Sequence, residues 1–234
     1  MIGSVIRAAA ALAALAMLPA AAQMSEDTAK QATQETKLLV TEGTAVIGDL
    51  QPAINSGKTT KEQVSPDALV SQFKARYQKA AGAAFDDKAK GVVGDARRAY
   101  LNAFTSVVTR YQSNLQKGGQ DAFVPAFFRA QVLKEFNQLM QGKVQAYATN
   151  RDEELINSDW AVHKVMKGSA LAGEVPGLMK TGSLDPVVRR SGGSMMGYYP
   201  MKLAPACVAC HAQNGLKQTE GGFGGALIVE VPVK

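Results

Sequence analysis

The chain contains 234 residues with a formal net charge of +6, and hydrophobic residues make up 46% of it. This length allows one sizeable core, or a helical part joined to a small second domain. Apart from the region of its two cysteines, the sequence contains no cluster with metal-ligand spacing and no phosphate-binding loop. The positive charge favours acidic partner surfaces or anionic lipid headgroups.

Residues 1–22 have the pattern of a secretory signal peptide. A positively charged start ending at Arg7 is followed by an apolar core from Ala8 to Leu18 and by the small residues Pro19-Ala20-Ala21-Ala22. The apolar run is shorter than the roughly 20 residues that span a bilayer. We therefore expect cleavage after Ala22 and export to the periplasm, with an uncleaved membrane anchor as the alternative. No later segment is long and apolar enough to cross a membrane, so we expect no transmembrane segment in the mature chain.

Residues 23–141 are predicted to form a helical region, because apolar residues recur there at three- to four-residue spacing. Ser65-Pro66 is typical of an N-cap followed by proline at the first helical position. Gly57 ends the first helical stretch, and the pair Gly91 and Gly94 is a potential interruption. Lys117-Gly118-Gly119 is a predicted helix end. The expected helical stretches are 24–50, 65–80, 100–115 and 126–140.

The pattern changes after Gly142, and residues 142–234 are predicted to form a second region that contains a sheet. Val144, Ala146 and Ala148 alternate with more polar residues, which is the period of a strand. Glycine and proline are frequent beyond residue 150, which argues against long helices there. Two further strands are expected at 197–201 and 226–231, and Pro232 stops the second. Helices followed by strands predict an α+β fold class.

The most informative motif is Cys207-Val208-Ala209-Cys210-His211. The spacing C-x-x-C-H is that of c-type haem attachment, in which each thiol forms a thioether with a haem vinyl group and the histidine ligates the iron. We therefore predict one covalent haem c held by Cys207 and Cys210, with His211 as the proximal iron ligand. The alternative is a redox-active or structural thiol pair beside an unrelated histidine.

The position of this motif near the C-terminus argues against two classes of cytochrome. Small electron-transfer cytochromes carry C-x-x-C-H on an N-terminal helix. Cytochromes of the c-prime type carry it on the last helix of a four-helix bundle, with little chain after it. In this sequence a glycine-rich turn and a valine-rich strand follow the motif, so neither arrangement fits.

The C-terminal part instead resembles the haem-c-binding PAS-like domain family. The resemblance rests on Pro-Val-Val-Arg-Arg at 186–190, Tyr-Tyr-Pro at 198–200, Ala-Cys-Val-Ala-Cys-His at 206–211 and Gly-Gly-Ala-Leu-Ile-Val-Glu-Val-Pro at 224–232. It implies a helical N-terminal part packed on a PAS-like antiparallel sheet that carries the haem. Such domains occur as free periplasmic proteins and as sensor regions of membrane-bound histidine kinases.

This chain departs from the family pattern in three ways. It lacks an Arg-Asn-Pro-x-Asn segment upstream of the motif, and Ser169 to Gly177 is a degenerate counterpart at best. It has no additional cysteine in the helical part, which excludes a thiolate as second iron ligand. It also has no kinase or receptor module, so a signalling role would require a separate partner protein.

The second axial ligand of the iron does not follow from the motif. His163 is one candidate, and Met195, Met196 and Met201, which precede the motif, are others. An open, five-coordinate iron is a further alternative. Each of these side chains can equally be an ordinary core or surface residue that binds no iron. The same holds for the candidate walls of the haem pocket: Trp160, Tyr198, Tyr199 and Phe223.

The ligation state decides which function is expected. A six-coordinate iron suits electron transfer, whereas an open iron binds small gases and suits sensing. We expect a periplasmic electron carrier or redox-responsive protein, with a haem-based gas or redox sensor as the alternative. No enzymatic activity is expected, apart from weak peroxidase-like activity if the iron is open. The expected partner is a redox or membrane signalling protein and not a nucleic acid. The sequence does not decide between a monomer and a homodimer.

Overall fold

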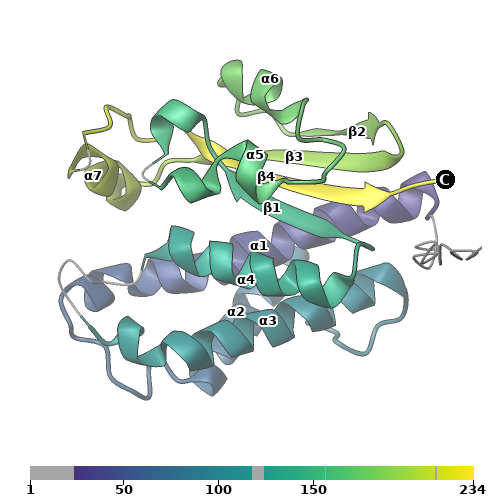
Figure 1. The fold of residues 1–234 in the computed structure, drawn as a ribbon. Helices are drawn as coiled ribbons and strands as arrows, with labels where there is room; N and C mark the ends of the chain where they lie inside the picture. Colours follow the sequence, from purple (N-terminus) through teal and green to yellow (C-terminus); the bar gives the residue numbers. More distant parts are fainter. Residues whose placement is uncertain (1–23, 118–123, 156, 214) are drawn as a thin grey trace, which may run out of the picture.

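The computed structural model describes residues 24–117, 124–155, 157–213 and 215–234. The expected signal peptide and the expected helix end at Gly118-Gly119 lie outside these residues. The described chain is α+β: a layer of long helices lies against a four-stranded antiparallel sheet (Figure 1). The predicted fold class, a helical part followed by a sheet, is confirmed.

The helical layer consists of α1 (Glu26–Asn55), α2 (Pro66–Ala81), α3 (Gly91–Leu115) and α4 (Pro125–Met140). The predicted start of α2 is confirmed, because the Ser65 side chain accepts a hydrogen bond from the Ala68 backbone N–H. Proline in the first turn of α2 needs no hydrogen-bond acceptor there, which explains why it is tolerated.

The potential interruption lies just before the pair Gly91 and Gly94, because α2 ends at Ala81 and α3 begins at Gly91. Gly91 begins α3 with a φ of 77°, in the left-handed region, and the helix continues through Gly94. The preceding chain passes so close to Gly94 that an added Cβ would collide with the Ala89 carbonyl oxygen. Gly94 therefore permits a close backbone approach and does not break the helix.

The sheet contains β1 (Gln145–Thr149), β2 (Val187–Ser191), β3 (Ser194–Lys202) and β4 (Phe223–Pro232). Their spatial order is β1-β4-β3-β2, and all neighbours are antiparallel. β1, β3 and β4 correspond to the three predicted strands, whereas β2 is not among them. β2 joins β3 through a tight hairpin in which Gly192 has a φ of 57°.

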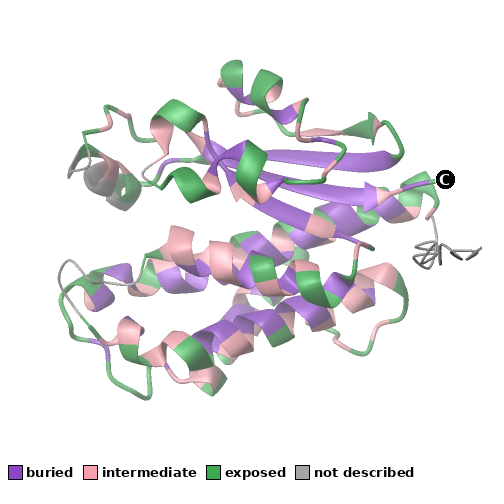
Figure 2. Cartoon of the chain, viewed as in Figure 1, coloured by how far each residue is buried: buried purple, intermediate pink, exposed green. Residues whose placement is uncertain are grey.

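Different elements cover the two faces of the sheet (Figure 1). On one face α1 and α4 pack against the strands, and Met195 and Tyr199 of β3 join the core of the helical layer. On the other face, Met196 and Tyr198 join a second apolar cluster. The sheet is therefore largely buried on both sides (Figure 2). The short helices on that second side are η2 (Asp152–Glu154), η3 (Ser158–Trp160), α5 (Val162–Val165) and α6 (Val175–Lys180).

The helical part and the sheet share one hydrophobic core. The boundary predicted at residue 142 lies in the turn between α4 and β1, but apolar side chains of α1, α4, β3 and β4 pack together across it. Met24, just before α1, also forms a parallel bridge with Val233, just after β4. Within the described ranges, no helix combines the length and apolar character needed to cross a membrane.

Candidate functional site

The C-x-x-C-H motif lies on α7 (Pro205–Gln213), a short helix in the connection between β3 and β4 (Figure 1). Two backbone hydrogen bonds close the base of this connection: Leu203 N–H to the Gly222 carbonyl (3.0 Å) and Gly221 N–H to the Leu203 carbonyl (2.9 Å). α7 is therefore anchored where it leaves the sheet, beside the end of β3 and the start of β4.

α7 has little packing of its own. No other described helix or strand packs extensively against it, and it lies at one edge of the molecule in Figure 1. A helix this short is only marginally stable in water without tertiary packing. An apolar group bound to α7 would supply that packing.

Positions 207, 210 and 211 all lie on α7, three and four residues apart, which is the spacing of neighbouring positions on a helix. The Cys207 thiol is free and the residue is exposed. The backbone of Cys210 belongs to α7, while its side chain lies outside the described part of the chain. Two thiols one turn apart, followed at once by a histidine, match the spacing that a covalent haem requires.

His211 is half-buried and has a defined orientation. Its Nδ1–H donates a hydrogen bond to Gln218 Oε1, which leaves Nε2 as the nitrogen free to bind a metal. Gly215, with a φ of 81°, reverses the chain after α7 and lets Gln218 return to the histidine. A metal-binding histidine typically donates its second ring N–H to such an acceptor. Gln218 belongs to no recognisable motif in the sequence.

Arg129 of α4 lies beside the motif, and it too is absent from the predicted site. Its Nη1 donates a hydrogen bond to Met201 Sδ at 2.9 Å, and its Nε is buried with no acceptor among the described residues. Burial lowers the pKa of the guanidinium, while the Cys207 and Tyr100 side chains act to raise it. The hydrogen bond to Met201 brings Arg129 to the end of β3, four residues before α7 begins.

The structure separates the methionine candidates. Met196 is fully buried in the cluster on the far face of the sheet, and Met195 is buried against the helical layer. Met201 lies near the end of β3, is half-buried, and shares Arg129 as a neighbour with Cys207. Of the three methionines, Met201 is the one that the structure places near the motif.

The other predicted ligand, His163, is exposed on α5, which packs against β1 and η3. Among the described residues, α5 makes no extensive contact with the motif helix. His163 therefore stays a candidate from its residue type alone.

The aromatic candidates are divided between the two faces of the sheet. Tyr199 faces the helices and donates a hydrogen bond to Thr33 Oγ1 (3.1 Å). Tyr198 and Phe223 belong to the cluster on the other face, where the Arg151 guanidinium lies 4.8 Å from the centre of the Phe223 ring. Because Tyr198 and Tyr199 face opposite sides, they cannot both wall one cavity on a single face.

Trp160 lies in η3 and is half-buried. Its backbone carbonyl accepts a hydrogen bond from Thr149 Oγ1 at 2.6 Å, which ties η3 to the end of β1.

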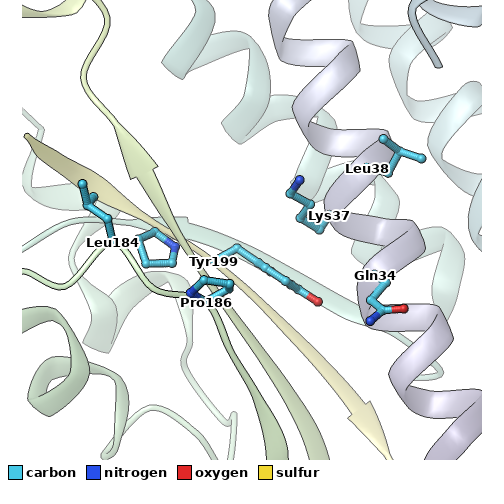
Figure 3. A pocket seen from close by; sticks show the side chains of 7 residues that line it. Gln34, Lys37, Leu38, Leu184, Pro186 and Tyr199 are labelled. Carbon is cyan, nitrogen blue, oxygen red and sulfur yellow. The ribbon is translucent and has the colours of Figure 1, made fainter. Parts of the chain in front are cut away.

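A cleft of about 380 Å³ lies between α1 and the sheet (Figure 3). Its walls are mainly apolar, and Figure 3 shows Gln34 and Lys37 of α1 across from Tyr199 and Pro186. The volume is within the range of small-molecule sites. No residue of α7 lines this cleft, so the cleft and the motif are separate features of the described chain.

The donor set near α7 is compatible with a haem. The described residues contain no group of three or more His, Cys, Asp or Glu side chains that could hold a metal, and the Cys210 side chain lies outside them. A haem would supply the porphyrin nitrogens, with His211 Nε2 as a further ligand of the iron. A free thiol, an oriented imidazole and an unpaired guanidinium beside them are all compatible with that group.

No family model, curated protein or solved structure matches this chain. Function is therefore inferred from the motif and from its surroundings in the fold.

Proposed function

We propose that the protein is an exported c-type haem protein that carries one haem c on Cys207 and Cys210, with His211 as the proximal iron ligand. The supporting observation is the hydrogen bond from His211 Nδ1–H to Gln218 Oε1. A histidine that ligates iron through Nε2 needs an acceptor at Nδ1 to fix its tautomer and ring orientation.

When bound, the haem supplies an iron that accepts and releases one electron. The chain supplies everything else. Cys207 and Cys210 fix the group by thioether bonds, and His211 sets its orientation. Gln218 increases the electron density of the imidazole by accepting its Nδ1–H.

We extend the proposal to a haem-c-binding PAS-like fold. The antiparallel sheet, the preceding helices and the motif helix between the two central strands support it. The proposed location is the periplasm, where thiols and haem are joined. The proposed partner is a redox or membrane signalling protein, and the net charge of +6 favours an acidic surface on it.

Electron transfer is the role we favour, because Met201 offers a thioether sulfur near the motif. A His/Met iron is coordinatively saturated and suits an electron carrier. The alternative is a sensor of a gas or of redox state. In its favour, Arg129 engages Met201 Sδ through a 2.9 Å hydrogen bond, which would leave the second axial position of the iron open.

Absorption spectra of the oxidised and reduced protein, with and without carbon monoxide, separate these roles. A carrier shows sharp reduced α and β bands that carbon monoxide does not change. A sensor shows a broad reduced band that shifts when the gas is added. Met201→Leu should convert the first spectrum into the second, whereas Met196→Leu, the matched control in the far cluster, should not. A sharp, gas-insensitive spectrum that persists in Met201→Leu would exclude Met201 as ligand.

A further inference from the structure

Arg129 differs from every other arginine that the structure describes. Each of the others lies within ion-pair distance of a carboxylate, whereas Arg129 has no such partner in the described ranges. The paired arginines are Arg76, Arg97, Arg98, Arg110, Arg151, Arg189 and Arg190.

The unpaired charge of Arg129 is also the one whose burial is energetically unfavourable. Arg129 is half-buried with its Nε fully enclosed, while Arg110 and Arg190 expose about half of their side chains, at 52% and 48%. A cation removed from water without a counter-ion is strongly unfavourable. Burial accordingly depresses the pKa of Arg129. No described side chain neutralises this charge, so an anion bound here would be favourable.

The edge of the guanidinium that lacks an acceptor indicates which kind of anion would pair with it. Nη1 is occupied by Met201 Sδ, and neither Nε nor Nη2 has an acceptor among the described atoms. The Nε–Nη2 edge presents two parallel N–H groups, the geometry that binds both oxygens of one carboxylate.

The location indicates the source of that carboxylate. Arg129 Nη1 contacts Met201, four residues before the motif helix begins, yet no hydrogen bond joins Arg129 and Cys207 in the described structure. In a haem, the vinyl groups that bond to cysteine and the two propionates lie on opposite edges of the macrocycle. A residue that binds a propionate is therefore not expected to contact the attachment thiols, which agrees with the lack of a hydrogen bond between Arg129 and Cys207.

We propose that Arg129 binds a propionate carboxylate of the covalently attached haem. The inference rests on the proposed function, since it requires haem on Cys207 and Cys210. It assigns to the helical layer a direct part in holding the cofactor, because Arg129 belongs to α4 while the attachment helix follows β3. It also predicts that Arg129 keeps the propionate ionised.

The test compares Arg129→Gln, Arg129→Lys and the matched control Arg110→Gln in haem-loaded protein. The readouts are covalent haem content, the resonance Raman bending mode of the propionates, and the midpoint potential as a function of pH. In Arg129→Gln we expect full haem content, a shifted propionate mode and a lower potential. The propionate pKa read from the pH profile should rise by roughly 1–3 units, because a neighbouring cation is lost. The propionate mode, potential and propionate pKa of Arg129→Lys should lie between those of the wild type and Arg129→Gln. Arg110→Gln should match the wild type in all three.

The outcomes distinguish this inference from the proposed function. Haem-free wild-type protein would overturn both. Full haem content with an unchanged propionate mode and pH profile in Arg129→Gln would overturn the inference alone. Asp121 lies outside the described residues, and an Asp121→Asn variant that reproduces the whole Arg129→Gln effect would make Asp121 the partner instead. If Arg129→Gln does not accumulate, Arg129→Lys and a crystal structure of the haem-loaded wild type decide, since the latter shows directly whether a propionate meets the guanidinium.

Discussion

At the scale of single residues, the loop after α7 controls how His211 is presented. Gly215 turns the chain, and Gln218 accepts the Nδ1–H of the imidazole. Such an outer partner makes a ligating histidine a stronger electron donor to the metal. The protein can therefore adjust the iron without changing a ligand.

Replacing Gln218 by alanine removes this acceptor. We expect covalent haem content to be unchanged and the midpoint potential to rise, because a weaker donor stabilises ferric iron less. Gln218→Glu should lower the potential by strengthening the acceptor. Spectroelectrochemical titration measures both, with Lys217→Ala, an exposed neighbour, as control. A Gln218→Ala potential equal to that of the wild type would show that Gln218 does not act on the iron.

Tyr198 and Tyr199 allow a matched test of the two faces of the sheet. The Tyr199 hydroxyl is bonded to Thr33, whereas the Tyr198 hydroxyl is buried without a partner in the described chain. Tyr199→Phe should lower the free energy of unfolding by about 0.5–1.5 kcal/mol. Tyr198→Phe should leave it unchanged or raise it slightly, because an unsatisfied buried hydroxyl is removed. Urea unfolding distinguishes the two variants. Equal losses of unfolding free energy would contradict the different hydrogen bonding of the two hydroxyls.

At the scale of elements, two helical glycines have different reasons to be present. Gly48 of α1 has open space where a Cβ would lie, whereas Gly94 of α3 lies against the Ala89 carbonyl. Gly48→Ala should stabilise the protein by about 0.5–1 kcal/mol through helix propensity. Gly94→Ala should destabilise it by more than about 1 kcal/mol, because the incoming chain must move. Thermal unfolding of both variants tests this. If Gly94→Ala stabilised the protein, the close approach of the Ala89 carbonyl to Gly94 would be refuted.

A polar network joins three helices. Glu35 of α1 accepts hydrogen bonds from Tyr77 of α2 (2.8 Å) and from Arg97 Nε of α3 (2.8 Å). Burial, then the hydrogen bond and charge of Glu35, raises the pKa of Tyr77 to about 12. A tyrosine whose pKa is higher in the folded state stabilises that state below pH 10, its ordinary pKa, and loses this contribution as pH rises toward 12.

The pH dependence of stability tests this network. The free energy of unfolding of the wild type should fall between pH 10 and 12, since the unfolded chain releases the Tyr77 proton first. Tyr77→Phe should show a shallower fall over the same range, although it is less stable at neutral pH. Parallel pH profiles for the two proteins would mean that Tyr77 titrates normally.

At the scale of the whole molecule, local periodicity accounts for what could be predicted. The long helices and the strands β1, β3 and β4 follow from apolar spacing within a few residues. β2 has no such signal, because it is a short edge strand whose residues Arg189 and Arg190 are exposed. Its pairing with β3 arises from the hairpin at Gly192-Gly193.

The candidate site also contains some residues that the sequence predicts and others that only the fold reveals. C-x-x-C-H is a local motif and can be recognised without a structure. Arg129 cannot, because it meets Met201 from 72 residues away and resembles any charged residue of an amphipathic helix. Gln218 lies in a loop without periodicity, so only the fold reveals its bond to His211. The residues that support the motif are thus determined by tertiary packing.

Extraction of the cofactor tests directly whether haem is covalently attached to this chain. The protein would be matured in cells with intact cytochrome c biogenesis, extracted with acid-acetone, and its absorption spectrum recorded. We predict that the haem bands stay with the polypeptide in the wild type and are lost when Cys207 and Cys210 are both replaced by alanine. Haem that extracts into the solvent, or wild-type protein with no haem absorbance, would contradict the account and leave Cys207 and Cys210 as a thiol pair.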